Sequence, residues 1–258
     1  MNSPIFAGTA EYYSRYRPPY PDELLSDLLT HSVGTHGRHL VDLGCGTGEV
    51  ALPLSAAFDT VTAIDIDPAM VALAERKGGE QKIDNVRWLV GPAESLELPD
   101  GSADLVVAGS SFHWMDRALL STRVYSWLVG TGVIAVLGGG SEVWDQKAEW
   151  QVVAVATIRK HLGERRLAGN QAYGVTGQHS DFLVAAGFTM ESRQYEVEKV
   201  WTADEIVGYL YSTSFANPAV LGDKKDLFEA DLRRRLHDLS AVDAFPETLK
   251  FYFMLGRK

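Results

Sequence analysis

The chain has 258 residues, a length that favours one large domain or one domain with an added cap. Hydrophobic residues make up 46% of the chain and charged residues 22%, so the composition excludes disordered and fibrous proteins. The formal net charge of −10 argues against a polyanionic partner such as a nucleic acid.

The first predicted elements are a helix, a strand and a second helix. A helix is predicted from Pro21 onward, because the leucines that follow recur with the 3.6-residue period of an amphipathic helix. Next come a short apolar run at residues 39–43, which predicts a strand, the glycine-rich residues 44–48 and a helix-compatible segment at 50–58. Pro53 lies inside this last segment, where its missing N–H matters, so we expect the helix to start late or to bend there.

A second strand and helix follow in the same arrangement. The apolar run at residues 61–65 predicts a strand, and Asp67 followed by Pro68 predicts a capped helix start. Three more apolar runs predict strands at residues 86–90, 104–108 and 133–137. Apart from Asp104, the last two runs are continuously apolar, as expected of strands that are covered on both faces.

The second half of the chain mixes helices with two strand candidates. Helical patterns cover residues 144–162, 181–186 and 221–239, and strand patterns cover residues 190–200 and 249–255. Apolar side chains alternate along the last of these segments, which suits a strand that closes the edge of the sheet.

Strands that alternate with helices predict an α/β fold with a doubly wound, mostly parallel, seven-stranded sheet and an N-terminal helical segment. Ligands of such sheets bind at the edge where the C-terminal ends of the parallel strands meet. We expect residues 1–140 to form this ligand-binding core. Residues 141–258 are expected to add helices that cover the ligand edge, and the final strands, within the same compact domain.

Cysteine usage and the N-terminal residues suggest the cellular setting. Cys45 is the only cysteine, which excludes an internal disulfide framework and a cysteine-rich metal site. Residues 1–10 have no basic region followed by a long apolar region, and no apolar stretch of 18 residues follows, so we expect a cytoplasmic protein without membrane attachment. The densest basic run, at residues 233–235, lies in a helical pattern and is typical of a solvated face.

The most informative stretch is the sequence DLGCGTG at residues 42–48. Glycines at alternate positions let the backbone turn sharply and approach a ligand closely. Asp65 falls at the end of the second predicted strand, where a carboxylate can accept both hydroxyls of a ribose. The combination predicts a ligand that contains a nucleoside.

Two nucleoside ligands compete for this loop. A dinucleotide fingerprint needs a glycine at the sixth position counted from Gly44, but Glu49 stands there and would bring a negative charge towards a pyrophosphate. NAD, and with it an oxidoreductase, is therefore disfavoured. A nucleoside that carries a zwitterionic amino-acid tail suits the loop better, and S-adenosylmethionine is such a ligand.

The motifs resemble those of the class I S-adenosylmethionine-dependent methyltransferases, in the order found in that family. The matching segments are residues 41–48, 63–68, 91–96, 104–107 with 112–114, and 128–133. The upstream residues 12–21 (YYSRYRPPYP) look like the lead-in of the small-molecule branch called type 11. The resemblance implies a Rossmann-like fold and methyl transfer to a small molecule.

The same resemblance implies which residues bind the cofactor. Glycines 44, 46 and 48 would line its methionine part, Asp65 would hold the ribose, and Ile66 would pack on the adenine, with Ala93 and Glu94 on the other side of that ring. The full set of expected cofactor residues is Arg17, Asp42, Gly44, Gly46, Gly48, Asp65, Ile66, Ala93, Glu94 and Ser110. Arg17 would hold the cofactor's carboxylate, with a surface ion pair as the alternative.

Catalytic and substrate residues are expected on the N-terminal segment and after the fourth strand. Tyr13 and Tyr16 would surround the sulfonium with aromatic faces and oxygen atoms, and the alternative is a structural segment covering the sheet. His113 could take a proton from an acceptor hydroxyl, or merely hydrogen-bond its loop. Tyr20, Phe112 and Trp114 would contact the substrate.

An aromatic group in the second half has two possible roles. Its members could wall an apolar substrate pocket, although aromatic residues at such spacing usually form the core. They are Trp144, Trp150, Trp201, Tyr209, Tyr211 and Phe215. The histidines and acids show no ligand spacing, so no catalytic metal is predicted.

The predicted function is therefore methyl transfer to an O or N atom of a small molecule, such as a secondary metabolite or a metabolic acid. The alternative is a module that binds S-adenosylmethionine without catalysis. Methylation of nucleic acid is disfavoured by the charge and by the sequence GSSF at residues 109–112, where an Asn/Asp-Pro-Pro-Tyr motif would be needed. The oligomeric state stays open.

Overall fold

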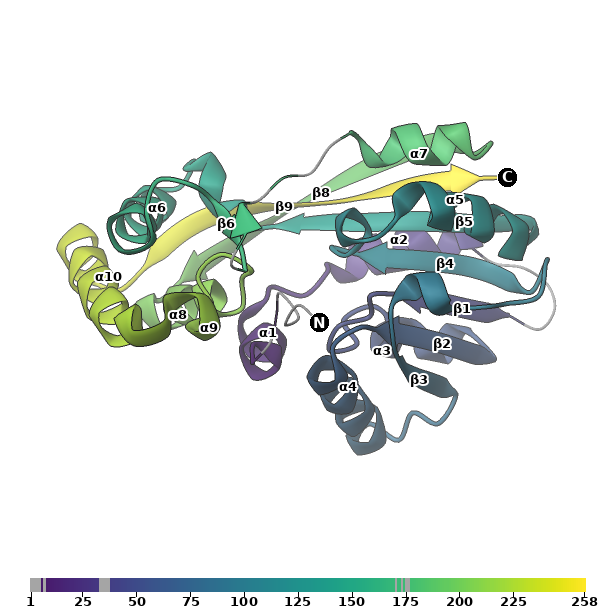
Figure 1. Cartoon of the computed structure of the whole chain (residues 1–258), viewed down its shortest axis with the longest axis horizontal. Helices are drawn as coiled ribbons and strands as arrows, with labels where there is room; N and C mark the ends of the chain where they lie inside the picture. The colour runs from purple at the N-terminus through teal and green to yellow at the C-terminus, as the bar shows by residue number, and fades with distance from the viewer. Residues whose placement is uncertain (1–5, 7, 33–37, 170, 173, 175–176) are drawn as a thin grey trace. The chain divides into compact units, whose positions relative to one another are not determined.

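The computed structural model describes residues 6, 8–32, 38–169, 171–172, 174 and 177–258 (Figure 1). Residue contacts divide the chain into two compact units. Unit 1 comprises Met1–Pro18, Gly140–Gly174 and Glu196–Lys250, and unit 2 comprises Pro19–Gly139, Val175–Tyr195 and Phe251–Lys258. The chain passes between the units five times, after Pro18, Gly139, Gly174, Tyr195 and Lys250.

The strands form one seven-stranded sheet in the order β3, β2, β1, β4, β5, β9, β8. Their bounds are β1 (His39–Leu43), β2 (Thr60–Asp65), β3 (Val86–Val90), β4 (Ala103–Gly109), β5 (Leu128–Gly140), β8 (Thr189–Trp201) and β9 (Phe245–Arg257). β1 pairs in parallel with β2 and β4, β2 with β3, and β4 with β5. The prediction of a doubly wound, mostly parallel, seven-stranded sheet is confirmed.

Helices accompany the strands in both units (Figure 1). Those that lie in unit 2 are α2 (Asp22–Ser32), α3 (Ala51–Leu54), α4 (Pro68–Glu80), α5 (Arg117–Trp127) and α7 (His179–Ala185). Those that lie in unit 1 are α1 (Ala10–Tyr16), α6 (Glu149–Leu162), α8 (Ala203–Tyr211), α9 (Pro218–Leu221) and α10 (Lys225–Leu239). Unit 1 also contains two short strands that pair in antiparallel, β6 (Leu167–Ala168) and β7 (Gln171–Ala172).

The core of unit 2 lies around the central strands. β4 is buried at every residue except its last, as its mostly apolar sequence predicted. Asp67 caps α4 as predicted, because its Oδ1 accepts a hydrogen bond from the backbone N–H of Ala69 at 2.9 Å. Since β1, β2 and β4 run in parallel, their C-terminal residues Leu43, Asp65 and Gly109 lie at the same edge of the sheet. This edge positions the candidate site.

Three predicted helices begin or end elsewhere than expected. The helix expected at residues 50–58 is the four-residue α3, which ends one residue after Pro53 and continues as a 3₁₀ turn. The helix expected from residue 144 begins at Glu149, because Gln146 adopts a left-handed backbone with φ of +54°. Likewise α10 begins at Lys225, after Gly222 with φ of +51°.

The prediction that residues 249–255 close the sheet edge is wrong. These residues belong to β9, which lies between β5 and β8, so β8 forms that edge of the sheet. The burial along the two strands agrees, because most side chains of β8 are exposed whereas those of β9 alternate between buried and exposed. Alternation identifies a half-buried strand but does not identify its neighbours.

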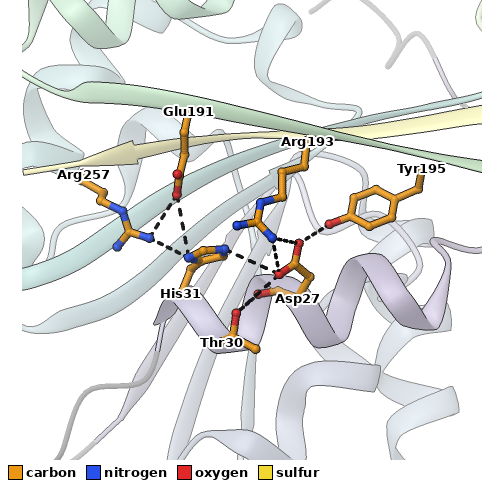
Figure 2. Close-up of polar contacts among 7 residues, drawn as sticks. All are labelled: Asp27, Thr30, His31, Glu191, Arg193, Tyr195 and Arg257. Carbon is orange, nitrogen blue, oxygen red and sulfur yellow. Dashed lines mark hydrogen bonds and ion pairs between the residues drawn. The ribbon is translucent and has the colours of Figure 1, made fainter.

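A polar cluster in unit 2 connects α2 to β8 and β9 (Figure 2). Arg193 of β8 donates to both carboxylate oxygens of Asp27 on α2, at 2.8 and 2.7 Å, and the Tyr195 hydroxyl donates to the same carboxylate. On the next helical turn, His31 Nδ1 accepts a hydrogen bond from Arg257 of β9 at 2.7 Å. These contacts fasten α2 to the outer strands of the sheet.

Candidate functional site

The glycine loop follows β1 along the chain and is hydrogen-bonded to the end of β2. The backbone N–H groups of Gly44 and Cys45 both donate to the Ile64 carbonyl, at 2.8 and 3.0 Å. Gly44 has φ of +70°, and a Cβ placed on it would lie 2.5 Å from Cβ of Ser111. Only glycine fits there, so the turn brings the chain of β1 against the loop that follows β4.

Asp65 at the end of β2 is bound to the same loop. Its Oδ2 accepts a hydrogen bond from the Gly46 N–H at 2.9 Å, and its Oδ1 accepts one from the Asp67 N–H at 2.9 Å. Burial raises the pKa of the Asp65 carboxyl above its usual value, while these two N–H groups lower it. Each oxygen keeps a second lone pair, so the carboxylate can still accept two hydroxyl groups.

Asp42 provides a buried acceptor beneath the loop. Its Oδ2 accepts a hydrogen bond from the Ala51 N–H at 3.1 Å, whereas its Oδ1 is buried and has no hydrogen-bond partner among the described residues. Burial, with a smaller contribution from Asp65, raises the pKa of Asp42 to about 7. An oxygen in this state favours a ligand that brings a hydrogen-bond donor or a positive charge.

Glu49, which argued against a dinucleotide, forms an ion pair in the structure. Lys77 of α4 donates to its Oε1 at 2.9 Å, and the Thr47 hydroxyl donates to the same oxygen at 2.6 Å. The same Lys77 ammonium also donates to the Thr47 carbonyl at 2.9 Å. The acid therefore holds the loop to α4.

The residues expected around an adenine differ in exposure. Ile66 is 62% exposed and offers an apolar surface on which a flat ring can pack. Ala93 is buried in a 3₁₀ turn. Glu94 accepts a hydrogen bond from the Asp116 N–H through Oε1 at 2.7 Å, so this carboxylate also positions the loop before α5.

Ser110, directly after β4, has a strained backbone. Its φ is +52°, a conformation that costs a non-glycine residue on the order of 1 kcal/mol and is typical of functional loops. Its hydroxyl lies 3.1 Å from the hydroxyl of Tyr20, and Ser111 donates to the Leu43 carbonyl at 2.6 Å. The structure therefore brings the predicted residues Ser110 and Tyr20 together, next to the end of β1.

The three residues after Ser111, which are Phe112, His113 and Trp114, differ in how deeply they are buried. Phe112 is completely buried in the hydrophobic core, which differs from the expected contact with substrate. His113 is half-buried, and its ring centre lies 4.6 Å from that of Trp114, which is 36% exposed. Phe112 turns inward because these residues form a 3₁₀ turn, which points neighbouring side chains in different directions.

A second histidine was missed by the sequence reading. The His179 ring at the start of α7 lies 6.2 Å from the His113 ring and 5.5 Å from the Phe112 ring. Burial and the neighbouring Arg117 lower the pKa of His179 below its usual value. No motif marks this residue; the only available signal was its position just before a predicted helix.

Tyr13, Tyr16 and Arg17 belong to unit 1, whereas the glycine loop belongs to unit 2. Within unit 1, Tyr16 packs so closely on Gly208 of α8 that a Cβ there would overlap its ring. Arg17 donates through Nε to the Ser212 hydroxyl at 2.9 Å. The roles of these three residues at the cofactor stay predictions.

Most of the aromatic group in the second half forms core. Trp150 and Trp201 are essentially unexposed, with ring centres 5.6 Å apart, and Tyr209 packs against both. Tyr211 and Phe215 are also buried, whereas Trp144 is half-buried.

The described residues contain neither a helix that could span a membrane nor a cluster of potential metal ligands. No helix in that part of the chain combines the length and apolar character needed to cross a membrane. The same residues contain no group of three or more His, Cys, Asp or Glu side chains that could hold a metal ion.

The arginines of the basic run at residues 233–235 form ion pairs with acids of the same helix. Arg233 pairs with Glu229 at 2.8 Å, and Arg234 and Arg235 pair with Asp231 at 2.5 and 3.1 Å.

Known proteins match the segment that contains the glycine loop. Residues 41–136 match the family model of a methyltransferase domain, type 11. The chain is 32% identical over 126 residues to CRG1 of Saccharomyces cerevisiae, named as a probable S-adenosylmethionine-dependent methyltransferase, across 48% of this chain and 43% of that protein. It is 36% identical over 98 residues to a trans-aconitate 2-methyltransferase of Deinococcus radiodurans, across 38% of this chain and 36% of that protein. The matched segments span less than half of either relative.

One solved structure is similar over almost the whole chain. The YcgJ protein of Bacillus subtilis has a TM-score of 0.59 and 17% identity, covering 92% of this chain and 100% of that one. At this identity the similarity concerns the fold alone, and it agrees with the sheet described above.

Proposed function

We propose that this chain, whose residues 41–136 belong to the class I S-adenosylmethionine-dependent methyltransferases of type 11, transfers a methyl group from S-adenosylmethionine to an O or N atom of a small molecule. The observation that carries the proposal is the hydrogen bond between Gly46 and Asp65. It holds a carboxylate at the ligand edge, beside a loop that only glycine can form.

The residues of unit 2 fit this cofactor. Asp65 has acceptor capacity for the two ribose hydroxyls, and Ile66 offers an apolar surface for the adenine. Beneath the loop, the unpartnered oxygen of Asp42 suits the positively charged amino group of the methionine part. The chain binds the cofactor through Gly44, Gly46 and Gly48, whose backbone can approach it closely.

When bound, S-adenosylmethionine would supply a methyl group by in-line displacement: the bond from the acceptor atom to the methyl carbon forms while the carbon–sulfur bond breaks and the neutral thioether leaves. Because the sulfur loses its positive charge in this step, no strong acid is needed, and the chain contributes mainly by positioning the reactants. Tyr13 and Tyr16 hold the donor in place through their aromatic faces and hydroxyl groups. For a hydroxyl acceptor, His113 accepts the proton at its imidazole.

The acceptor is a small molecule, with Tyr20 and Trp114 among the residues that contact it. Metabolic acids and secondary metabolites are the candidates. One relative is named for trans-aconitate, an unsaturated acid, which favours the former group.

Two measurements test this function. Calorimetric titration with S-adenosylhomocysteine and with NAD asks which nucleoside binds, and only the first is expected to release heat. Incubation with methyl-labelled S-adenosylmethionine and a panel of small acids, phenols and amines then asks whether label reaches an acceptor. Binding without transfer to any class would favour the alternative, a module that binds the cofactor without catalysis.

A further inference from the structure

Lys77 of α4 contacts the glycine loop through its ammonium group. Its Nζ donates to the Thr47 carbonyl at 2.9 Å and to Oε1 of Glu49 at 2.9 Å. The side chains of Lys77 and Glu49 are only 22% and 26% exposed, so water and salt screen this ion pair less than they screen a pair on the open surface. One cation therefore binds both the backbone and the acid of the loop.

The hydroxyl of Thr47 completes this network within the loop. It donates to the same Oε1 of Glu49 at 2.6 Å, and Thr47 is fully buried. In the backbone, the Gly48 N–H donates to the Cys45 carbonyl at 2.9 Å, which closes a tight turn. The turn and the hydroxyl thus place the Thr47 carbonyl and the Glu49 carboxylate where one ammonium can bind both.

Tight packing beside Lys77 brings α4 close to the loop. A Cβ placed on Gly78, the next residue of α4, would lie 3.4 Å from Cδ2 of Leu52 and 3.7 Å from the Trp88 ring. A Cβ placed on Gly48 of the loop would lie 2.8 Å from Cδ1 of Leu52 and 3.4 Å from the same ring. Because neither glycine has a side chain, α4 and the loop pack on the same two residues, and the ammonium can reach the loop.

The loop is also held from the end of β2. The N–H of Gly46 donates to Oδ2 of Asp65 at 2.9 Å. Gly46 and Thr47 are neighbours, so two consecutive residues are fixed by two different elements, β2 and α4. A loop that is ordered before its ligand arrives loses less conformational entropy when the ligand binds.

The charge of Glu49 gives Lys77 a second effect on the loop. S-adenosylmethionine carries a carboxylate on its methionine part, which is expected at Gly44, Gly46 and Gly48. An unpaired Glu49 carboxylate in this loop would repel that group, whereas the ion pair with Lys77 neutralises the acid. The pair therefore allows a loop that contains an acid to bind an anionic group.

We propose that Lys77 is a positioning residue of the methyl-donor site and sets the affinity for the amino-acid tail of the donor. It acts through the loop in two ways, because it holds the Thr47 carbonyl in place and neutralises Glu49. The inference rests on the proposed function, since it concerns the site that would bind S-adenosylmethionine.

The test is calorimetric titration of the full chain with two compounds. S-adenosylhomocysteine carries the amino-acid tail, and 5′-methylthioadenosine is a thioether of the same nucleoside without it. Lys77→Met removes both hydrogen bonds and the charge, so its affinity for S-adenosylhomocysteine is expected to fall by about tenfold, because hydrogen bonds to charged groups are the stronger ones. Its affinity for 5′-methylthioadenosine should not change. Lys82→Met is the matched control, since it makes the same substitution at an exposed residue just beyond the end of α4.

Further variants distinguish positioning from general damage to the fold. Lys77→Arg keeps the charge and can donate to both oxygens, so it should recover most of the lost affinity. Adding Glu49→Gln to Lys77→Met removes the unpaired acid, and this double variant should bind S-adenosylhomocysteine more tightly than Lys77→Met does. Thermal unfolding checks that each variant is folded. If Lys77→Met does not fold, Lys77→Gln replaces it, because its amide can still donate to one oxygen, and a smaller but equally selective loss is expected.

Each contrary result has a distinct meaning. If the wild type does not bind S-adenosylhomocysteine, the proposed function fails. If the wild type binds this compound and the folded Lys77 variant binds it equally well, Lys77 does not position the donor. The same conclusion follows if the variant loses affinity for both compounds alike, or if neither Lys77→Arg nor the added Glu49→Gln restores any affinity.

Discussion

The backbone N–H of Gly46 donates to Oδ2 of Asp65 at 2.9 Å, so the glycine loop and the acid at the end of β2 form one hydrogen-bonded unit. The orientation of the carboxylate depends on the shape of the loop, and the loop depends on the carboxylate. Changes to either partner should therefore affect the binding of the nucleoside.

Replacing Asp65 by alanine removes both the acceptor for the ribose and the partner of the loop N–H. We expect the affinity for S-adenosylhomocysteine to fall by about tenfold or more, because hydrogen bonds to charged groups contribute about 1.5–3 kcal/mol. Calorimetric titration measures the change. Asp84→Ala, at an exposed acid between α4 and β3, is the control. Equal affinity for Asp65→Ala and the control would refute this role.

Gly44→Ala tests the close approach of the loop to the segment after β4. The new Cβ would lie 2.5 Å from Cβ of Ser111 on a backbone with φ of +70°. Overpacking of this kind lowers the free energy of unfolding by about 1–3 kcal/mol. At Gly79, in α4, a Cβ meets nothing within 4 Å, so Gly79→Ala should instead raise stability by up to about 1 kcal/mol. Denaturant unfolding of both variants should therefore give shifts of opposite sign.

Asp42 should make the stability of the ligand-free protein depend on pH. Its pKa is about 7 in the folded chain and about 3.9 in an unfolded one, so the folded state holds the proton more tightly. The protonated Asp42 carboxyl stabilises the folded chain fully at pH values below its pKa in the unfolded chain. This stabilisation is lost as the pH rises through its pKa in the folded chain, and the total loss is on the order of 4 kcal/mol. Asp42→Asn should flatten this loss between about pH 4 and 7 in thermal unfolding curves. If the unfolding temperatures of the wild type and Asp42→Asn depend on pH in the same way, this role of Asp42 is contradicted.

Asp27 should stabilise unit 2 more than an exposed ion pair does. It accepts hydrogen bonds from Arg193 and Tyr195 (Figure 2). The hydrogen bond from Tyr195 is the main cause that lowers the pKa of Asp27, so this stabilisation is present above the usual carboxyl pKa and is lost as the pH falls. At neutral pH, Asp27→Asn should lower the free energy of unfolding by about 1 kcal/mol or more.

The matched control for this cluster is Asp238→Asn, which removes an exposed acid that lies 3.5 Å from Arg234. Exposed pairs contribute about 0–1 kcal/mol, so this change should have little effect. If denaturant unfolding gives equal losses for the two variants, the cluster does not fasten α2.

The variant His113→Gln distinguishes a catalytic role of His113 from a structural one. If the imidazole accepts the proton of an acceptor hydroxyl, kcat should fall by about 10²-fold and the acidic limb of the pH profile should disappear. The affinity for S-adenosylhomocysteine and the unfolding temperature should stay unchanged. The control is His237→Gln, at an exposed position on α10. A kcat within about twofold of the wild type would assign His113 to its loop.

The sequence predicted the elements whose signals are local. Apolar runs identified the five parallel strands, and Asp67 with Pro68 marked the start of α4. The place of β9 in the sheet was not predictable in this way, because strand order depends on contacts between distant segments. Pro53 signalled a disturbed helix but did not show that α3 would have only four residues.

In the candidate site, too, features with a local sequence signal were predictable, and features that depend on the folded chain were not. The glycine loop and Asp65 could be identified because backbone geometry fixes both residue types and spacing. The burial of Phe112 could not be predicted, because a 3₁₀ turn, which the pattern does not reveal, points its ring into the core. His179 carries no motif, and only the folded chain shows which side chains lie beside it.

The most direct test of the account is a calorimetric titration of the full chain with S-adenosylhomocysteine, repeated with Asp65→Ala. We predict saturable heat with one site per chain for the wild type, and a clear loss of affinity for the variant. If the wild type releases no heat and its unfolding temperature does not rise with this compound, the glycine loop and Asp65 do not bind the methyl donor, and the proposed function is wrong.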